Sequence, residues 1–232
     1  MRAPPKAPVP GAPMVLLAFS YFGPKEEAEA FFEEKIPKDA LAQAVNVTTG
    51  AADFAKINDP YAAMSRHGGF KEFEGGFLEE VDEEGLIKAF EIFLKYTEPS
   101  WSRAGSNFLI SCWSPAKVGE MADHSPRSFF PSKDRAFFTQ AVPWYETQEE
   151  REEAIQFARG VYDALSAKDT SQGRRKWGFV NNVHIESDMR EVFSDAQIEE
   201  IVHVKSVFDK HALGWSPVAD GWSIDMSVQE PS

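Results

Sequence analysis

The chain has 232 residues, of which 43% are hydrophobic and 13% aromatic, enough apolar material for one sizeable core. Its 24 basic and 37 acidic residues give a formal net charge of −13. The longest basic cluster, Arg174-Arg175-Lys176, is too short for the basic stripe of a nucleic-acid-binding protein and is typical of a solvated loop. The acidic balance also disfavours anionic membranes, so we expect neither nucleic acid nor membrane as a partner.

The cysteine content and the apolar runs indicate the compartment. Cys112 is the single cysteine, which excludes an internal disulfide and reads as a small buried hydrophobe. The apolar run from Met14 to Tyr21 is too short for a membrane span and lacks the small-residue cleavage site of a signal peptide. These features predict a cytoplasmic location.

The first third of the chain begins with residues 1–13, which are rich in Pro and Ala and predict a disordered leader. Met14 to Tyr21 predicts a buried strand. Pro24 favours the start of a helix because Pro has no N–H to lose there, and Pro37 ends that helix. A weak alternation over residues 44–48 indicates a second strand.

The middle of the chain gives clearer signals. Phe70, Phe73 and Phe77 lie in a strand candidate interrupted by glycines. Asp82 is placed to cap a helix with an apolar face at Leu86, Phe90, Phe93 and Leu94. Phe108 to Trp113 alternates as a strand does, and residues 114–133 form a polar loop of a length that is often functional.

The last hundred residues begin with a strand from Arg135 to Trp144. Thr147 and Glu150 then form a capping box for a helix that reaches Leu165. Trp177 to Val183 is the next strand candidate. Ser194 and Gln197 form a second capping box, which starts the final helix.

This order of elements predicts an α+β fold, with a mostly antiparallel sheet and helices packed on one face. We expect a single domain over residues 14–232, after the leader of residues 1–13.

The chain shows no strong motif of metal, nucleophilic or nucleotide chemistry. Its five histidines have no paired spacing, and neither GxSxG nor GxGxxG occurs. The pairs Gly68-Gly69 and Gly75-Gly76 are isolated and read as turns. We therefore predict no metal site and no cofactor-binding residues.

Three late segments carry a resemblance to a known family. Phe137 to Trp144 is followed by an acidic helix start. Phe179-Val180-Asn181-Asn182 is similar to a Tyr-x-Asn-Tyr stretch, and Ile201 to Asp209 is similar to a closing Leu-x-x-(Ile/Val)-Lys-x-Lys-Tyr-Asp-Pro pattern. In this order they resemble the substrate-binding, C-terminal half of berberine-bridge-type FAD-linked oxidases of the vanillyl-alcohol-oxidase superfamily.

The resemblance covers the substrate domain and leaves out the FAD-binding domain. Tyrosines of the family pattern are replaced by Phe179 and Phe208. We therefore expect no cofactor, the alternative being FAD held only with a separate partner domain. A substrate domain alone would bind FAD weakly, because its few contacts must offset the translational and rotational entropy that the ligand loses on binding.

The resemblance implies a pocket for an apolar small molecule, an intermediate of secondary metabolism. We expect a flavin-independent cyclisation of Diels–Alder type, or an isomerisation. The candidate catalytic residues are Asn181, Asn182 and His184, and the candidate substrate-binding residues are Trp113, Phe138, Trp144, Trp177 and Phe179. Two alternatives remain: a truncated or split FAD-linked oxidoreductase, and a non-catalytic ligand-binding or dimerisation module that forms a homodimer through the exposed sheet face.

Overall fold

The computed structural model describes residues 1–51, 53–57, 59, 68–98, 101–114, 116, 135–179, 181–182 and 189–209. Its backbone contacts divide the chain into two compact units, one of Met1–Met14 with Gly69–Ser232 and one of Val15–Gly68. The sequence had led us to expect one domain from residue 14 onward.

A four-stranded sheet lies at the centre of the larger unit. It consists of β2 (Glu74–Leu78), β3 (Asn107–Cys112), β4 (Phe137–Val142) and β6 (Trp177–Gly178), in the spatial order β3-β4-β2-β6. Every neighbouring pair of these strands is antiparallel. A separate two-stranded ladder joins β1 (Phe70–Lys71) to β5 (Trp144–Tyr145).

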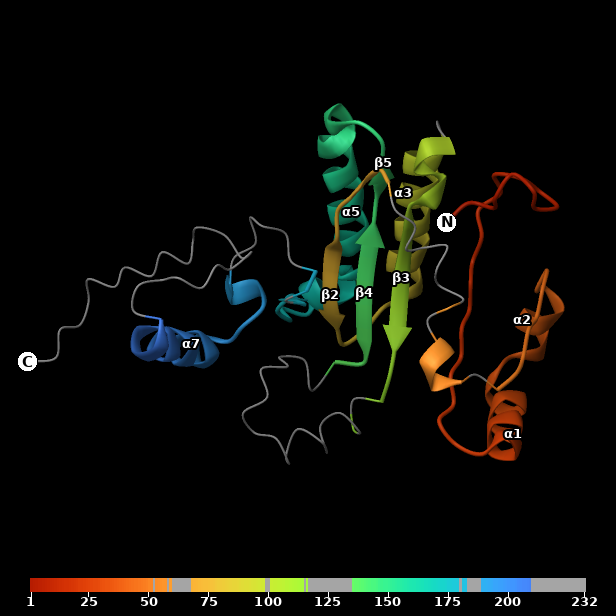
Figure 1. The fold of residues 1–232 in the computed structure, drawn as a ribbon, viewed down its shortest axis with the longest axis horizontal. Coiled ribbons are helices and arrows are strands. Elements are labelled where there is room, and N and C mark those ends of the chain that lie inside the picture. Colours follow the sequence, from red (N-terminus) through yellow and green to blue (C-terminus); the bar gives the residue numbers. More distant parts are fainter. Residues whose placement is uncertain are drawn as a thin grey trace, which may run out of the picture. The chain divides into compact units, whose positions relative to one another are not determined.

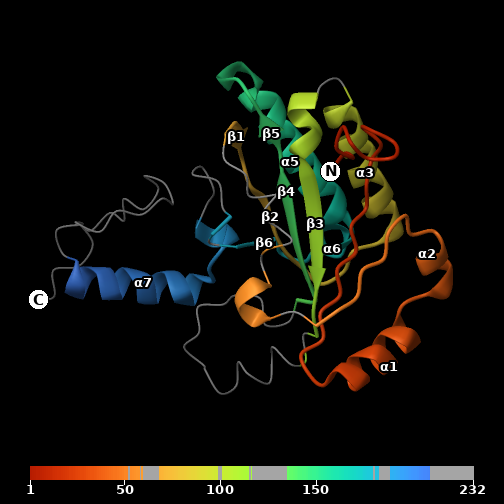
Figure 2. The same cartoon turned by 45° about the vertical axis from the view of Figure 1, so that its right-hand side comes forward.

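Two long helices, α3 (Glu83–Thr97) and α5 (Arg151–Leu165), pack against one another and against one face of this sheet, as Figures 1 and 2 show. The short α6 (Ala167–Ser171) follows α5. The order β2-α3-β3-β4-α5-β6 is the split β-α-β arrangement of ferredoxin-like domains. The predicted α+β class, antiparallel sheet and one-sided helix layer are confirmed.

The core lies between the helices and the sheet. Leu78 of β2, Ala141 of β4, Phe93 of α3 and Val161 of α5 are all buried in one cluster. Tyr96 stacks on Phe157 with the ring centroids 4.3 Å apart. Each large apolar side chain buried there stabilises the fold by about 1.5–3 kcal/mol.

The starts of both long helices follow the local sequence. The Asp82 side chain accepts a hydrogen bond of 2.9 Å from the backbone N–H of Gly85, as predicted. Thr147 and Glu150 form the predicted capping box in the 3-10 turn Gln148–Glu150 that leads into α5.

The pair Gly75-Gly76 lies in the middle of β2, so its interpretation as a turn is wrong. Gly75 has a φ of 154°, and a Cβ there would overlap the backbone of Thr139. A Cβ on Gly76 would overlap the carbonyl oxygen of Trp177 and lie 2.7 Å from the hydroxyl of Tyr162. These close approaches require glycine inside a strand, where it is otherwise unfavourable.

A buried ion network ties the end of β2 to α6. Asp169, 1% exposed, accepts hydrogen bonds from the backbone N–H of Glu79 at 2.8 Å and from the guanidinium of Arg174 at 2.8 Å. The guanidinium of Arg135 lies 3.3 Å from Asp169 and 2.9 Å from Glu79. Arg174, assigned from the sequence to a solvated loop, is therefore a structural cation.

Arg2, which lies in the leader predicted over residues 1–13, contacts the end of α3. The guanidinium of Arg2 donates to the hydroxyl of Thr97 at 2.8 Å and to the carbonyl of Leu94 at 3.1 Å, both in the last turn of α3. A cation there suits the free carbonyls of a helix end. Ala3 is buried.

The smaller unit contains α1 (Lys25–Lys35), α2 (Lys38–Ala42) and a 3-10 turn (Phe54–Lys56). The strand predicted over Met14 to Tyr21 is wrong, because these residues belong to no strand, and Val15 is 78% exposed. The strand predicted over residues 44–48 is also not formed. An apolar run forms a strand only where another strand offers its backbone groups.

The final described helix is α7 (Asp195–Phe208), which follows a 3-10 turn (Met189–Glu191). Ser194 and Gln197 form its predicted capping box. None of its residues is buried. Within the described ranges, no helix combines the length and the apolar character needed to cross a membrane.

Candidate functional site

The strand register places an aromatic row on the sheet face opposite α3 and α5, which we call the second face. Phe77 of β2 pairs directly with Phe138 of β4 and with Trp177 of β6, and Phe138 pairs with Ser111 of β3. Residues directly opposite one another in an antiparallel ladder share a face. Their neighbours Leu78 and Phe137 belong to the core on the helix side, which assigns this row to the second face.

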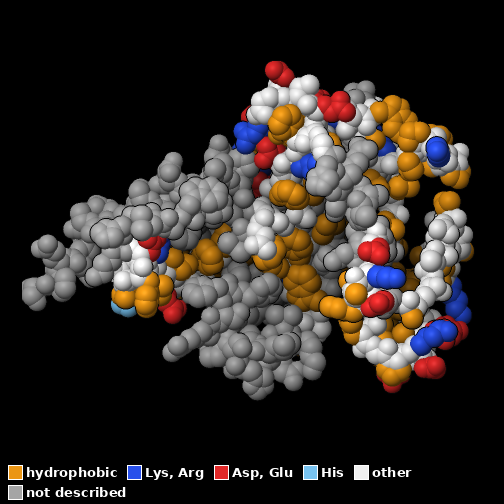
Figure 3. All heavy atoms as spheres, in the orientation of Figure 1, with side chains coloured by type: hydrophobic (Ala, Val, Ile, Leu, Met, Phe, Trp, Pro, Cys, Tyr) orange, Lys and Arg blue, Asp and Glu red, His pale blue; other side chains and the backbone are white. Residues whose placement is uncertain are grey.

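Four rings meet on this face: Phe77, Trp113, Phe138 and Phe179, which we call the aromatic cluster. The centroid of Phe77 lies 5.3 Å from that of Phe138, 5.6 Å from that of Phe179 and 5.8 Å from that of Trp113. Phe138 and Phe179 are 5.5 Å apart. Most of these pairs are edge-to-face, the favoured aromatic geometry. Figure 3 shows hydrophobic side chains over β2 and β4 on this side of the molecule.

Phe77 is the centre of the cluster and was not among the predicted site residues. It is 2% exposed, whereas Trp113, Phe138 and Phe179 are half-buried. Its role follows from the pairing of β2 with both β4 and β6, which joins segments far apart in the sequence. The structure does bring together three of the predicted substrate-binding residues: Trp113, Phe138 and Phe179.

Trp113 follows the last residue of β3. Its backbone N–H donates to the carbonyl of Ala136 at 3.0 Å, so the ladder with the chain before β4 continues by one residue. Its indole nitrogen is buried and has no hydrogen-bond partner among the described residues. Most buried donors are paired in proteins, so this nitrogen is an exception that needs an explanation.

Trp177, another predicted substrate contact, lies in the same row at the edge strand β6. The guanidinium of Arg175 stacks over its ring at 4.2 Å and donates to the carbonyl of Phe193 at 3.1 Å. A guanidinium over an indole face is a favourable cation–π pair. It places a positive charge beside the second face.

Trp144 lies elsewhere, in the two-stranded ladder of β1 and β5. Its ring packs against Gly105, in the 3-10 turn Trp101–Gly105, and the ammonium of Lys71 lies 3.9 Å from the ring centroid. Its backbone N–H donates to the hydroxyl of Ser106 at 2.8 Å. The structure therefore does not place Trp144 on the sheet that carries the cluster.

The predicted catalytic residues are described in part. Asn181 is exposed, and Asn182 is half-buried. The backbone N–H of Asn182 donates to the carbonyl of Phe179 at 2.7 Å. This hydrogen bond ties the backbone of Asn182 to that of Phe179, one of the four residues of the cluster. His184 lies outside the described residues, as do Val180, Val183 and most of the loop at 114–133.

Cys112 was expected to be buried, and this is wrong: its side chain is exposed at the end of the edge strand β3. Partial burial nevertheless raises the pKa of the thiol, which lowers its thiolate content at neutral pH and makes it a poor nucleophile. Within the part of the chain that the structure describes, no group of three His, Cys, Asp or Glu side chains is placed to hold a metal ion.

Two titratable residues with raised pKa values, Glu74 and Tyr162, lie on the helix side of the sheet. Burial is the main cause of the raised pKa of Glu74, and Arg159 opposes it. Burial also raises the pKa of Tyr162, whose hydroxyl has no partner among the described residues. Because this pair faces the core rather than the second face, it bears on stability.

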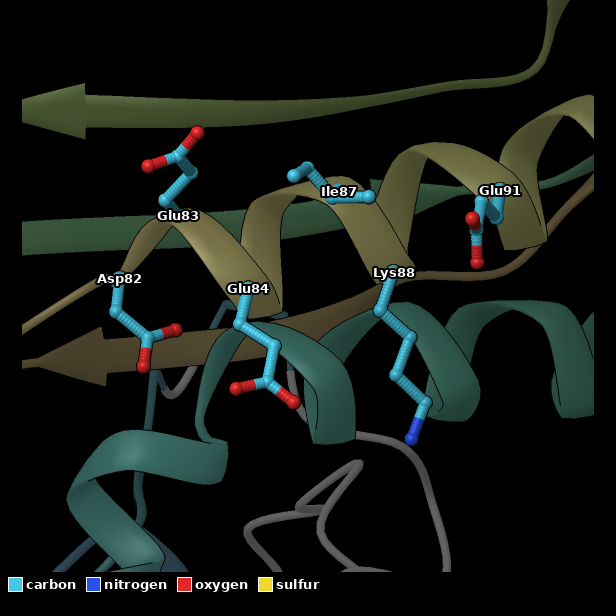
Figure 4. A pocket seen from close by; sticks show the side chains of 6 residues that line it. All are labelled: Asp82, Glu83, Glu84, Ile87, Lys88 and Glu91. Atoms are coloured by element: carbon cyan, nitrogen blue, oxygen red, sulfur yellow. The ribbon is translucent and has the colours of Figure 1, made fainter.

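A hollow of about 610 Å³ lies along α3 and is lined by Asp82, Glu83, Glu84, Ile87, Lys88 and Glu91. Figure 4 shows that these residues follow one another along α3 from its N-cap and that their side chains point apart, with Glu83 on one side and Glu84 and Lys88 on the other. A binding site needs polar groups that converge. We therefore assign this hollow to the solvated outer surface of the helix.

The sequence was also compared with known proteins. No protein-family model matches it, and no curated protein matches it. Function is therefore inferred from the residues of the aromatic cluster themselves.

Proposed function

We propose that the aromatic cluster binds an apolar, ring-containing small molecule and that the chain promotes its cyclisation or isomerisation. The observation that supports this is the meeting of four rings on the sheet face opposite the helix layer. A sheet buried by helices on one face needs no such cluster on the other for its own core.

The size of the cluster favours a small ligand over a protein partner. A stable protein interface covers about 800 Å² on each partner, and one aromatic side chain contributes about 150–250 Å² when fully buried. Phe77 is already buried and the other three rings are half-buried. The area that remains suits one or two rings of a ligand, each aromatic contact adding about 0.5–1.5 kcal/mol.

The proposed reaction class suits such walls. A cyclisation or isomerisation rearranges bonds within one molecule, so neither atoms nor electrons leave it. The main requirement is that the reacting ends are held close together in one orientation, which rigid aromatic walls provide. The sequence resemblance to the substrate domain of berberine-bridge-type oxidases supports the same class of ligand. The amides of Asn181 and Asn182 would supply polar contacts at the rim.

Binding is tested with Phe138→Leu, which removes one ring from the cluster. Its matched control is Phe70→Leu, since Phe70 stacks on Tyr145 in the separate two-stranded ladder. We expect a naphthalene-type ligand, followed by quenching of tryptophan fluorescence, to bind the Phe138 variant at least fivefold more weakly and the Phe70 variant as it binds the wild type. Equal effects of both variants, or no binding by the wild type, contradict the proposal.

The reaction is tested by mass spectrometry of conjugated polyene substrates after incubation. The expected product has the mass of its substrate and a different retention time. A product that has lost two hydrogen atoms would instead indicate an oxidation, as the split-oxidase alternative requires.

A second candidate function, self-association, is favoured by β3. This edge strand contains six residues without charge or Pro and pairs only with β4 among the described strands. Edge strands usually carry charges that prevent pairing with another chain. If β3 pairs with a second copy, light scattering will show a dimer, and Ser111→Lys at this exposed position will convert it to a monomer. A wild-type monomer at high concentration removes this candidate.

A further inference from the structure

Residues 15–22, which we call the arm, are an uncharged apolar run with the sequence VLLAFSYF. The structure describes all of them, and each is exposed and belongs to no helix or strand. Single exposed apolar residues are ordinary, but a continuous group of this size marks a surface that meets a partner. Five large side chains of the arm are more than half exposed: Val15, Leu16, Leu17, Phe19 and Phe22.

The smaller unit offers the arm little cover. No side chain is buried among its described residues. The closest packing is between rings: Tyr21 of the arm lies 5.6 Å from Phe31 and 6.4 Å from Phe32 of α1, centroid to centroid, and Phe19 lies 6.2 Å from Phe32. The helix α1 therefore supports two rings of the arm and leaves its other side chains uncovered.

The outer edge of β3, on the side away from β4, lacks what the arm could supply. Figure 1 shows β3 at one edge of the sheet, and β4 is the one described strand that pairs with it. Phe108 and Ile110 of β3 pack against the core but are only half-buried. An extended segment beside β3 would bond to its backbone and cover these two side chains. The arm of the same chain is not paired there, because it belongs to no strand.

We infer that the arm of one copy of the chain pairs with the outer edge of β3 in a second copy, and that two copies exchange arms in this way. This inference rests on the self-association candidate above, and it names what covers β3. The arm spans roughly 26 Å when extended and β3 roughly 20 Å, so the arm is long enough. It contains neither charge nor Pro, the residues that prevent strand pairing at an edge.

The area of contact favours a second copy over other occupants. The exposed parts of Phe19 and Phe22 offer together roughly 200–300 Å², and the aliphatic side chains of the arm add roughly 100–200 Å². Because each copy contributes one arm and one edge of similar area, an exchange covers about 800 Å² on each partner, the size of a stable interface. One arm on the edge of an unrelated protein gives half of this area. A membrane is disfavoured by the net charge of −13 and by Glu26 and Glu27, which follow the arm.

The test compares Leu17→Glu in the arm with Val45→Glu, a matched control that adds the same charge outside the arm at a position 91% exposed. Light scattering should give the wild type twice the 26.0 kDa of one chain. We expect Leu17→Glu to raise the dissociation constant of the dimer about tenfold or more, because pairing would bury its charge, and Val45→Glu to leave it within about twofold. Since Leu17 is 65% exposed, the circular dichroism of its variant should match that of the wild type.

Hydrogen exchange locates the contact without any variant. The backbone amides of the arm and of β3 should be protected in the wild-type dimer and should lose this protection on dilution to the monomer. A dimer whose arm amides exchange freely overturns the inference. A dimer that survives Leu17→Glu but not Ser111→Lys also overturns it, while the self-association candidate stands. If the wild type is a monomer at the highest concentration measured, both fail.

Discussion

The substitution Gly76→Ala tests the feature that joins the fold to the candidate site. Gly76 lies where β2 passes between β4 and β6, opposite Gly178. A methyl group there overlaps the carbonyl oxygen of Trp177 and approaches the hydroxyl of Tyr162 to 2.7 Å. Neither neighbour can easily give way, because one is backbone and the other is a buried ring.

The cost can be worked out from these contacts. To clear the methyl group, β6 must retreat by roughly an ångström, which breaks its short ladder with β2. Overpacking costs about 1–3 kcal/mol and each lost hydrogen bond about 0.5–1.5 kcal/mol. We expect the free energy of unfolding to fall by about 3 kcal/mol, a large part of the 5–15 kcal/mol typical of a domain.

Urea unfolding followed by circular dichroism measures this loss. The control is Gly160→Ala in α5, where the new Cβ would lie 3.6 Å from Ile92, an ordinary contact. Ala is the better helix former, so this variant should gain about 0.5–1 kcal/mol. Because Trp177 and Phe179 move with β6, Gly76→Ala should also weaken naphthalene binding. A Gly76 variant within about 0.5 kcal/mol of the wild type would refute the pairing of β2 with β6.

Three further substitutions test the polar contacts. Asp169→Asn leaves Arg135 beside a neutral group in a buried network, so urea unfolding should show a loss of about 3 kcal/mol; an unchanged midpoint contradicts this. Arg103→Lys replaces a guanidinium that binds both oxygens of Glu153 at 2.7 and 2.8 Å, so the melting temperature should fall by about 3–6 °C. A variant with the melting temperature of the wild type would show that this two-point contact is dispensable. Glu74→Gln concerns pH: burial raises the pKa of Glu74, so its contribution to stability is present below 4.5, the ordinary pKa, and is lost as pH rises through the folded pKa. The Gln variant should therefore have a higher melting temperature than the wild type at pH 7 and the same melting temperature at pH 3.5. A variant that melts below the wild type at pH 7 would contradict the raised pKa of Glu74.

The sequence predicted the parts of the fold that depend on local chemistry. Asp82, Thr147 and Ser194 cap helices as expected, because a cap needs only residues within one turn. The strands β3 and β4 were located because alternation is also local. The α+β class follows from the order of these elements.

The failures concern contacts between distant segments. The run from Met14 to Tyr21 has the composition of a strand, but composition does not supply a neighbouring strand. Gly75-Gly76 looked like a turn, since nothing in the sequence shows that two other strands approach it closely. Phe77 was missed as a site residue for the same reason, because its position depends on register with β4 and β6.

The candidate site was predicted by residue type better than by position. Aromatic residues at strand ends gave Trp113, Phe138 and Phe179, which do meet. Trp144 has the same type and a similar place at the end of a strand, yet Pro143 separates it from β4 and it pairs with β1 instead. Only the structure could distinguish these cases.

The position of β2 also has a consequence for the growing polypeptide. The ribosome releases β2 early, yet its two neighbours, β4 and β6, follow roughly sixty and a hundred residues later. At synthesis rates of about 5–20 residues per second, the strand waits for several seconds with its backbone unpaired on both sides. We expect chaperones to meet the nascent chain in this interval, and lower growth temperature to improve the yield of folded protein.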